Sequence, residues 1–212
     1  MGPRYGRYVA VLGLIALFAV ALYSTLSARR GLAGIAPGER LPPFAAPLAL
    51  GGPRGEVDVA ARANEGASGK RAACTVRGPG ILNICQLYER GPVVLALFID
   101  AGSCAGVLDD LQRIAPSFPQ VGFAAVAIRE DPASVARLVR SHRLTLPVGV
   151  DREGRLGVLY TMLSCPQITF AYPGGVVQSA ALLSRPPLAT LRARVSELAA
   201  ASRARGWKPG RP

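Results

Sequence analysis

Four cysteines are the residues of this 212-residue chain with the clearest capacity for chemistry. They are Cys74, Cys85, Cys104 and Cys165, and full pairing among them has three alternative forms. An even number of cysteines suits an exported domain in an oxidising compartment. A thiolate that attacks a disulfide forms a mixed disulfide, from which a second thiol must release the partner. The cysteine set therefore suits either structural disulfides or thiol–disulfide exchange.

Cys104 has the sequence context of a nucleophile. It follows a continuous apolar run at residues 93–99 and opens a segment, residues 104–115, with the apolar spacing of a helix. This spacing predicts that Cys104 lies at a helix N-terminus, where unpaired backbone N–H groups and the helix dipole stabilise a thiolate. Asp100 could accept its proton, although an aspartate there more often caps the following turn.

Other reactive groups have less support. His142 is the only histidine, and we expect it to be a solvated residue at a helix end. A single histidine gives little basis for a Ser-His-Asp triad or for a histidine-rich metal site. No Gly-rich phosphate loop follows any predicted strand. We therefore predict neither a metal nor a cofactor.

Strand-like and helix-like periodicities alternate from Pro92 onward. Strands are predicted at residues 93–99, 123–128, 146–150, 167–172 and 176–182, the last two joined by a Pro-Gly-Gly turn. Helices are predicted at residues 104–115, from Asp131-Pro132 onward, at 156–163 and at 188–200. This order predicts an α/β domain of three layers with a mixed central sheet.

An uncharged apolar segment at residues 9–26 predicts a membrane anchor. As a helix it would be about 27 Å long, close to the thickness of the bilayer hydrocarbon. We assign residues 1–8 to an N-terminal flank and residues 9–28 to a transmembrane helix. The arginines on its two sides are nearly balanced, so counting them does not set the orientation. A cleaved signal peptide is the alternative, and both interpretations export the rest of the chain.

The remaining residues divide by composition. Residues 29–60 are predicted to be a Pro/Gly-rich linker and entry segment, and residues 61–90 a loop insertion that contains Cys74 and Cys85. The compact domain is predicted at residues 91–202, before a basic tail at 203–212. The net charge of +12 favours anionic lipid surfaces, but zinc-finger spacing and aromatic–basic interleaving are both missing, so we predict no nucleic-acid partner.

Three stretches resemble the thioredoxin superfamily, and most closely its membrane-tethered, extracytoplasmic redoxins. They are residues 93–108 (VVLALFIDAGSCAGVL), 149–160 (GVDREGRLGVLY) and 165–177 (CPQITFAYPGGVV). The resemblance implies a thioredoxin-like fold with a cis peptide bond before Pro166. The family motif Trp-Cys-x-x-Cys is degenerate, because Ser103 replaces the tryptophan and Val107 the second cysteine. The peroxiredoxin pattern is also missing, since Leu97 and Ala101 occupy its proline and threonine positions.

The resemblance also implies how the cysteines pair and act. The residue before the cis-proline lies beside the first active-site cysteine in this fold, so Cys165 should face Cys104, which leaves Cys74 for Cys85. We therefore predict a thiol–disulfide oxidoreductase with Cys104 as nucleophile and Cys165 as resolving thiol, acting on exported protein thiols or with a membrane redox partner. The alternatives are a redox-inactive binding scaffold with a structural Cys104–Cys165 disulfide, and two buried thiols that act as small hydrophobes.

Overall fold

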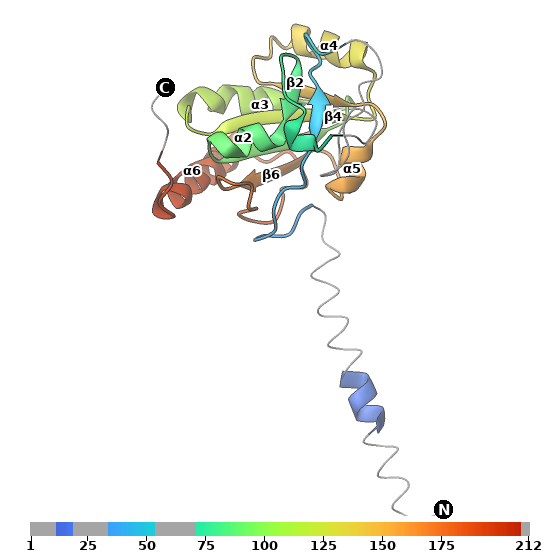
Figure 1. The fold of residues 1–212 in the computed structure, drawn as a ribbon, viewed down its shortest axis with the longest axis vertical. Coiled ribbons are helices and arrows are strands. Elements are labelled where there is room, and N and C mark those ends of the chain that lie inside the picture. Colours follow the sequence, from blue (N-terminus) through green and yellow to red (C-terminus); the bar gives the residue numbers. More distant parts are fainter. Residues whose placement is uncertain (1–11, 19–33, 54–70, 209–212) are drawn as a thin grey trace, which may run out of the picture. The chain divides into compact units, whose positions relative to one another are not determined.

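The structure is a computed structural model that describes residues 12–18, 34–53 and 71–208 (Figure 1). The chain divides into two compact units, Met1–Leu32 and Ala33–Pro212. In the first unit residues 12–18 are helical, and the rest of the predicted anchor and its flank lies outside the described residues. Within the described part of the chain, no helix is long and apolar enough to cross a bilayer.

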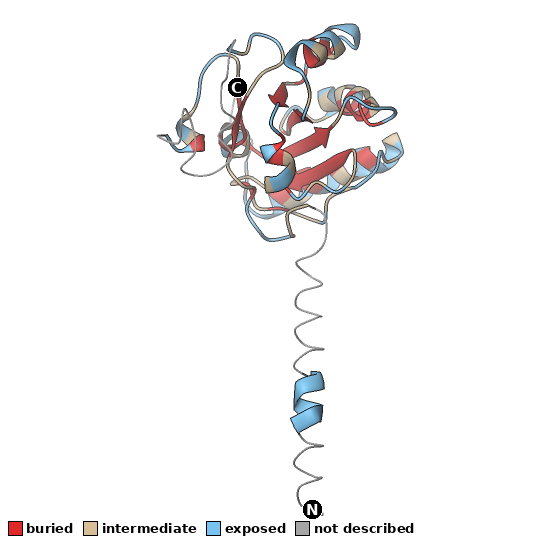
Figure 2. Ribbon diagram, turned by 90° about the vertical axis from the view of Figure 1, so that its right-hand side faces the viewer, coloured by how far each residue is buried: buried red, intermediate tan, exposed pale blue. Residues whose placement is uncertain are grey.

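A four-stranded sheet with the order β5-β4-β3-β6 forms the centre of the second unit. Strands β3 (Val93–Phe98), β4 (Gly122–Ile128) and β5 (Val148–Asp151) run parallel to one another, and β6 (Gln167–Ala171) runs antiparallel to β3. The predicted mixed sheet is therefore confirmed. Every residue of β3 is buried, as its continuous apolar sequence predicts (Figure 2).

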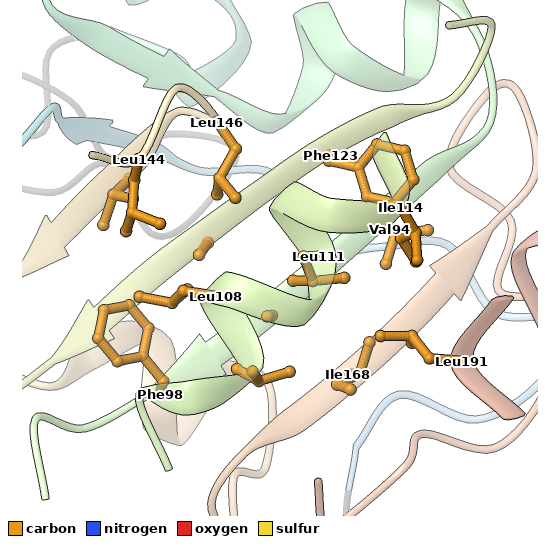
Figure 3. Close-up of a cluster of buried hydrophobic side chains, with 14 of the residues drawn as sticks. Val94, Phe98, Leu108, Leu111, Ile114, Phe123, Leu144, Leu146, Ile168 and Leu191 are labelled. Carbon is orange, nitrogen blue, oxygen red and sulfur yellow. The ribbon is translucent and has the colours of Figure 1, made fainter. Parts of the chain in front are cut away.

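Two apolar clusters cover the two faces of this sheet. On one face, Val94 and Phe98 of β3 pack with α3 (Gly106–Ile114), α4 (Pro132–Ser141) and α6 (Leu188–Ala204), as Figure 3 shows for α3 and α6. On the other face, Leu95 and Leu97 pack with the entry segment, α2 (Ile84–Arg90) and α5 (Arg155–Leu159). Because successive side chains of a strand point to opposite faces, the all-apolar strand requires both layers.

Most of the described part of the predicted loop insertion forms regular elements, so the loop prediction is wrong for residues 73–75 and 81–90. It contains the 3-10 helix η1 (Ala73–Thr75), strand β2 (Ile81–Asn83) and helix α2, and β2 pairs with β1 (Ala45–Pro47). The hydrogen bonds of the buried Asn83 side chain hold η1 and α2 in place. Its side-chain oxygen accepts hydrogen bonds from the N–H groups of Cys85 and Gln86, and its amide donates to two carbonyls near η1. The Gly-Pro-Gly turn at residues 78–80, just before β2, concealed this cap in the sequence.

Three other element boundaries differ from the sequence prediction. The expected strand at 176–182 makes only isolated bridges with β6, because Val177 also pairs with the entry segment through the Glu39 carbonyl. Helix α5 ends at Leu159, and Thr161 takes a left-handed conformation at φ 47°. Helix α6 runs on to Ala204, and Trp207 lies against Gly91, so residues 203–208 belong to the fold and not to a separate tail.

A disulfide between Cys74 and Cys85 joins η1 to α2, with the two Cα atoms 5.4 Å apart. Replacing both cysteines by serine should lower the free energy of unfolding by about 3 kcal/mol, because the crosslink restricts the unfolded chain. Urea titration of the doubly substituted and unsubstituted proteins measures this difference. A change below about 0.5 kcal/mol would show that the bond contributes little to stability.

Candidate functional site

A second disulfide joins Cys104 to Cys165 at the end of the central sheet where β3 stops and β6 begins, with the Cα atoms 5.5 Å apart. Cys104 lies in the turn after β3, and Cys165 directly precedes Pro166 and β6. The two strands are antiparallel neighbours in which Leu97 pairs with Gln167, so the end of one strand meets the start of the other. This topology brings together two cysteines that are 61 residues apart. The Cys165–Pro166 peptide bond is cis.

Cys104 is close to the start of α3 but is not part of the helix. The first N–H groups of α3, on Gly106, Val107 and Leu108, donate to carbonyls of the preceding turn. The unpaired N–H groups that we expected beside Cys104 are thus already satisfied by 3-10-type hydrogen bonds. The positive end of the α3 dipole is therefore what can stabilise a thiolate at this position. Cys104 itself is 5% exposed.

Cys165 is more accessible than Cys104. Its Sγ accepts a hydrogen bond from the backbone N–H of Ile99, at 3.2 Å. Cys165 lines a cavity of about 660 Å³, which Cys104 does not line. The cavity wall is mainly apolar and includes Val158, which is 76% exposed, and Leu163, which is 70% exposed. One of the two disulfide-bonded residues therefore borders an open apolar surface.

Asp151 fixes the α5 wall of this cavity. Its buried carboxylate accepts hydrogen bonds from the N–H groups of Gly154, Arg155 and Leu156, at 2.7 to 3.1 Å. Burial raises the pKa of Asp151, and these backbone donors oppose the rise. The carboxylate thus holds the first turn of α5, which contributes Gly154, Gly157 and Val158 to the cavity.

An ion pair between Arg185 and Asp110 lies beside the Cys104 turn. The Nε of Arg185 donates to the Asp110 Oδ2 at 2.6 Å, and the Asp110 side chain is only 5% exposed. The hydrogen bond with Asp110 raises the pKa of Arg185, so the guanidinium stays charged. A Cβ at Gly106 would lie 2.6 Å from the Arg185 Nη1, so the glycine allows the cation to lie against the start of α3.

The segment that carries Arg185 is attached to the residues around Cys165. The Oγ of Ser164 donates to the Leu183 carbonyl at 2.6 Å, and Leu182 pairs with Ile168 of β6. Arg185 therefore links the Cys165 segment to the start of α3 independently of the disulfide. The sequence gives no local indication that Arg185 pairs with Asp110, because the two residues are 75 positions apart and share no motif.

The two other sequence candidates take part in separate contacts. The His142 ring lies 3.0 Å from the Asp109 carboxylate, and it caps the end of α4 as an exposed residue. The backbone N–H of Asp100 donates to the Glu130 carboxylate at 2.7 Å. Neither contact involves a cysteine.

Comparison with known proteins identifies the fold. No protein-family model matches the chain, and no curated protein matches it. Among solved structures, it is similar to a secreted Mycobacterium tuberculosis disulfide oxidoreductase homologous to E. coli DsbE, with 20% identity over 56% of this chain and 90% of that chain at a TM-score of 0.50. It is also similar to the thioredoxin domain of a Bacteroides vulgatus thiol-disulfide oxidoreductase, with 10% identity, coverages of 78% and 99%, and a TM-score of 0.57.

A third similar structure is peroxidoxin BcpB of Mycobacterium tuberculosis, with 13% identity, coverages of 82% and 97%, and a TM-score of 0.54. The predicted thioredoxin-like fold is confirmed by these three structures. In this chain the fold carries a disulfide between the turn before α3 and the residue before the cis-proline.

Proposed function

We propose that this protein is a thiol–disulfide oxidoreductase that acts outside the cytoplasm, tethered to the membrane by residues 9–28. Its exchange centre is the Cys104–Cys165 pair, and its substrates, here called clients, are exported proteins with cysteines. One observation carries the proposal: the disulfide includes Cys165, a partly exposed residue that lines an open apolar cavity. The similarity to structures described as disulfide oxidoreductases supports it.

The exchange starts from the disulfide form. A client thiolate attacks one sulfur of the pair, so a mixed disulfide forms and the other cysteine leaves as a thiolate. A second client thiolate then attacks the mixed disulfide, which closes the client disulfide and releases the first cysteine. Two electrons pass from the client to the protein, and the two cysteines take up protons. A membrane disulfide carrier would restore the bond by the same reaction, and the reverse sequence would reduce a client.

The apolar cavity suits a client that is not yet folded. Val158 and Leu163 present large apolar side chains to solvent on the cavity wall. Cysteines of unfolded chains are accompanied by apolar side chains that folding would bury, and these can pack on such a wall. The cavity therefore favours unfolded exported proteins over small polar thiols.

The reduction potential of the Cys104–Cys165 couple tests the proposal. Equilibration of the full-length protein in a glutathione series should open this couple above about −250 mV, because structural disulfides usually lie below about −300 mV. Acid quenching and mass analysis count the open thiols. The Cys74→Ser/Cys85→Ser protein leaves a single couple to titrate and is the matched control.

Resistance to reduction until the protein unfolds would contradict the proposal. It would support the redox-inactive scaffold with a permanent Cys104–Cys165 bridge. The 5% exposure of Cys104 is the observation that favours this second function.

A further inference from the structure

We propose that Cys165 is the sulfur that client thiols attack and that Cys104 is the sulfur that leaves. This inference rests on the proposed exchange function. It reverses the roles that the resemblance to the thioredoxin superfamily assigns to the two residues. The reaction is an attack of a client thiolate on the Cys165 Sγ, which forms the client–Cys165 disulfide, breaks the Cys104–Cys165 bond and releases the Cys104 thiolate.

Accessibility favours attack at Cys165. Exchange is limited to a sulfur that the incoming thiolate can reach. Cys165 is partly exposed and lines the 660 Å³ cavity together with Met162 and Ser164. Cys104 is 5% exposed and belongs to the apolar cluster between the sheet and α3. A client chain that occupies the cavity would therefore meet Cys165 first.

The surroundings of Cys104 favour its departure. Exchange is faster when the leaving sulfur is more stable as a thiolate. Cys104 lies at the positive end of the α3 dipole, and the guanidinium of Arg185 lies against Gly106, two residues further on. The dipole favours negative charge on the leaving sulfur, and the Arg185 guanidinium lies at the same helix start, where it is paired with Asp110. The N–H of Ile99 meanwhile holds the Cys165 sulfur at the cavity wall.

Position 107 gives an independent reason for the reversal. In a Cys-x-x-Cys motif the second cysteine lies on the first turn of the helix, where it can attack a client bound to the first. Here Val107 occupies that position and is fully buried. The second cysteine of the pair is instead Cys165, which directly precedes β6 and lines the cavity. The exposed position and the helix-end position thus belong to two different segments of the chain.

Trapping the first mixed disulfide tests this assignment. The oxidised full-length protein is mixed with excess reduced glutathione, quenched with acid at short times, alkylated and mapped by mass spectrometry. We expect the earliest glutathione adduct on Cys165, with Cys104 alkylated. An early adduct on Cys104 would overturn the inference and leave the exchange function standing. A disulfide that stays closed in the folded protein would overturn both.

Two variants, each with one cysteine of the pair substituted, provide a second measurement. Cys104→Ser leaves Cys165 free, Cys165→Ser leaves Cys104 free, and both lose the same bond, so any effect on folding is shared. With glutathione disulfide as the probe, the free Cys165 should form its adduct about tenfold faster than the free Cys104, because access through the cavity should limit the rate more than the stability of the thiolate does. Equal rates, or a faster Cys104, would contradict the proposal. If both variants fail to fold, the trapping experiment on the unsubstituted protein still decides.

Discussion

Cys165→Ser should lower the rate at which the protein oxidises a client's thiols to a disulfide by at least roughly a thousandfold. A loss of this size is expected when a residue that forms a covalent intermediate is removed. A serine hydroxyl cannot form the mixed disulfide, so the first step of the exchange is lost. Cys104→Ser should also stop this oxidation, because the Cys104–Cys165 disulfide that accepts the client's electrons is missing. Given an oxidised client instead, the Cys165 thiolate of this variant should attack the client disulfide and stay attached, because the Cys104 thiol that would release it is missing. Multiple-turnover oxidation of a reduced, unfolded protein, with glutathione disulfide as the final oxidant, measures the rate, and non-reducing electrophoresis after mixing with an oxidised client detects the attached client.

Cys74→Ser/Cys85→Ser is the matched control for this experiment, because it removes the same number of sulfurs from the other disulfide. Its turnover should stay within about twofold of the unsubstituted protein at temperatures where it remains folded. Comparable losses in all three variants would indicate a common loss of stability. Retained turnover in Cys165→Ser would refute the proposed exchange centre.

Arg185→Gln should lower the free energy of unfolding by about 2 kcal/mol. Breaking a buried ion pair typically costs about 3–5 kcal/mol, because the remaining charge is left without a partner. Asp110 is buried, but the Arg185 side chain is 41% exposed, so solvent screens part of the interaction and reduces the expected loss. The same substitution should slow the opening of the Cys104–Cys165 disulfide by glutathione about three- to tenfold, since it removes a positive charge from the start of α3.

Arg113 provides the matched control. Its Nη1 lies 3.9 Å from the same Asp110 carboxylate, but its side chain is 61% exposed. Arg113→Gln should therefore change the stability by less than about 0.5 kcal/mol and leave the opening rate unchanged. Arg185→Lys, which keeps the charge, should recover most of the opening rate. If Arg185→Gln loses stability without any change in this rate, the residue is structural only.

The central sheet was predictable from the sequence because its two middle strands, β3 and β4, are apolar throughout. Residues 93–98 and 123–128 are unbroken apolar runs, and such runs have few alternatives to a strand buried on both faces. The start of α4 at Asp131 was equally predictable, because the Asp131 side chain accepts a hydrogen bond from the N–H of Ser134, only three residues later. Local signals of this kind need no knowledge of the rest of the molecule.

The features that the sequence did not reveal depend on contacts between distant segments. The turn residues near Val177 read as a hairpin strand, but the entry segment competes for its backbone groups. The pairing of Arg185 with Asp110 has no local signature. The unequal exposure of Cys104 and Cys165 depends on where α5 leaves a cavity, which no periodicity describes. The sequence therefore indicated which cysteines lie together, but not which of them lines the cavity.

The two disulfides lie on opposite faces of the central sheet. Cys85 is buried in the cluster with Leu95 and Leu97, whereas Cys104 belongs to the cluster with Val94 and Phe98. Each sulfur pair is therefore insulated from the other by β3, and an incorrect crosslink would require a cysteine to cross the strand. The two covalent loops, 74–85 and 104–165, also do not overlap along the chain. In the proposed exchange cycle, the Cys104–Cys165 bond therefore opens and closes without scrambling the Cys74–Cys85 bond.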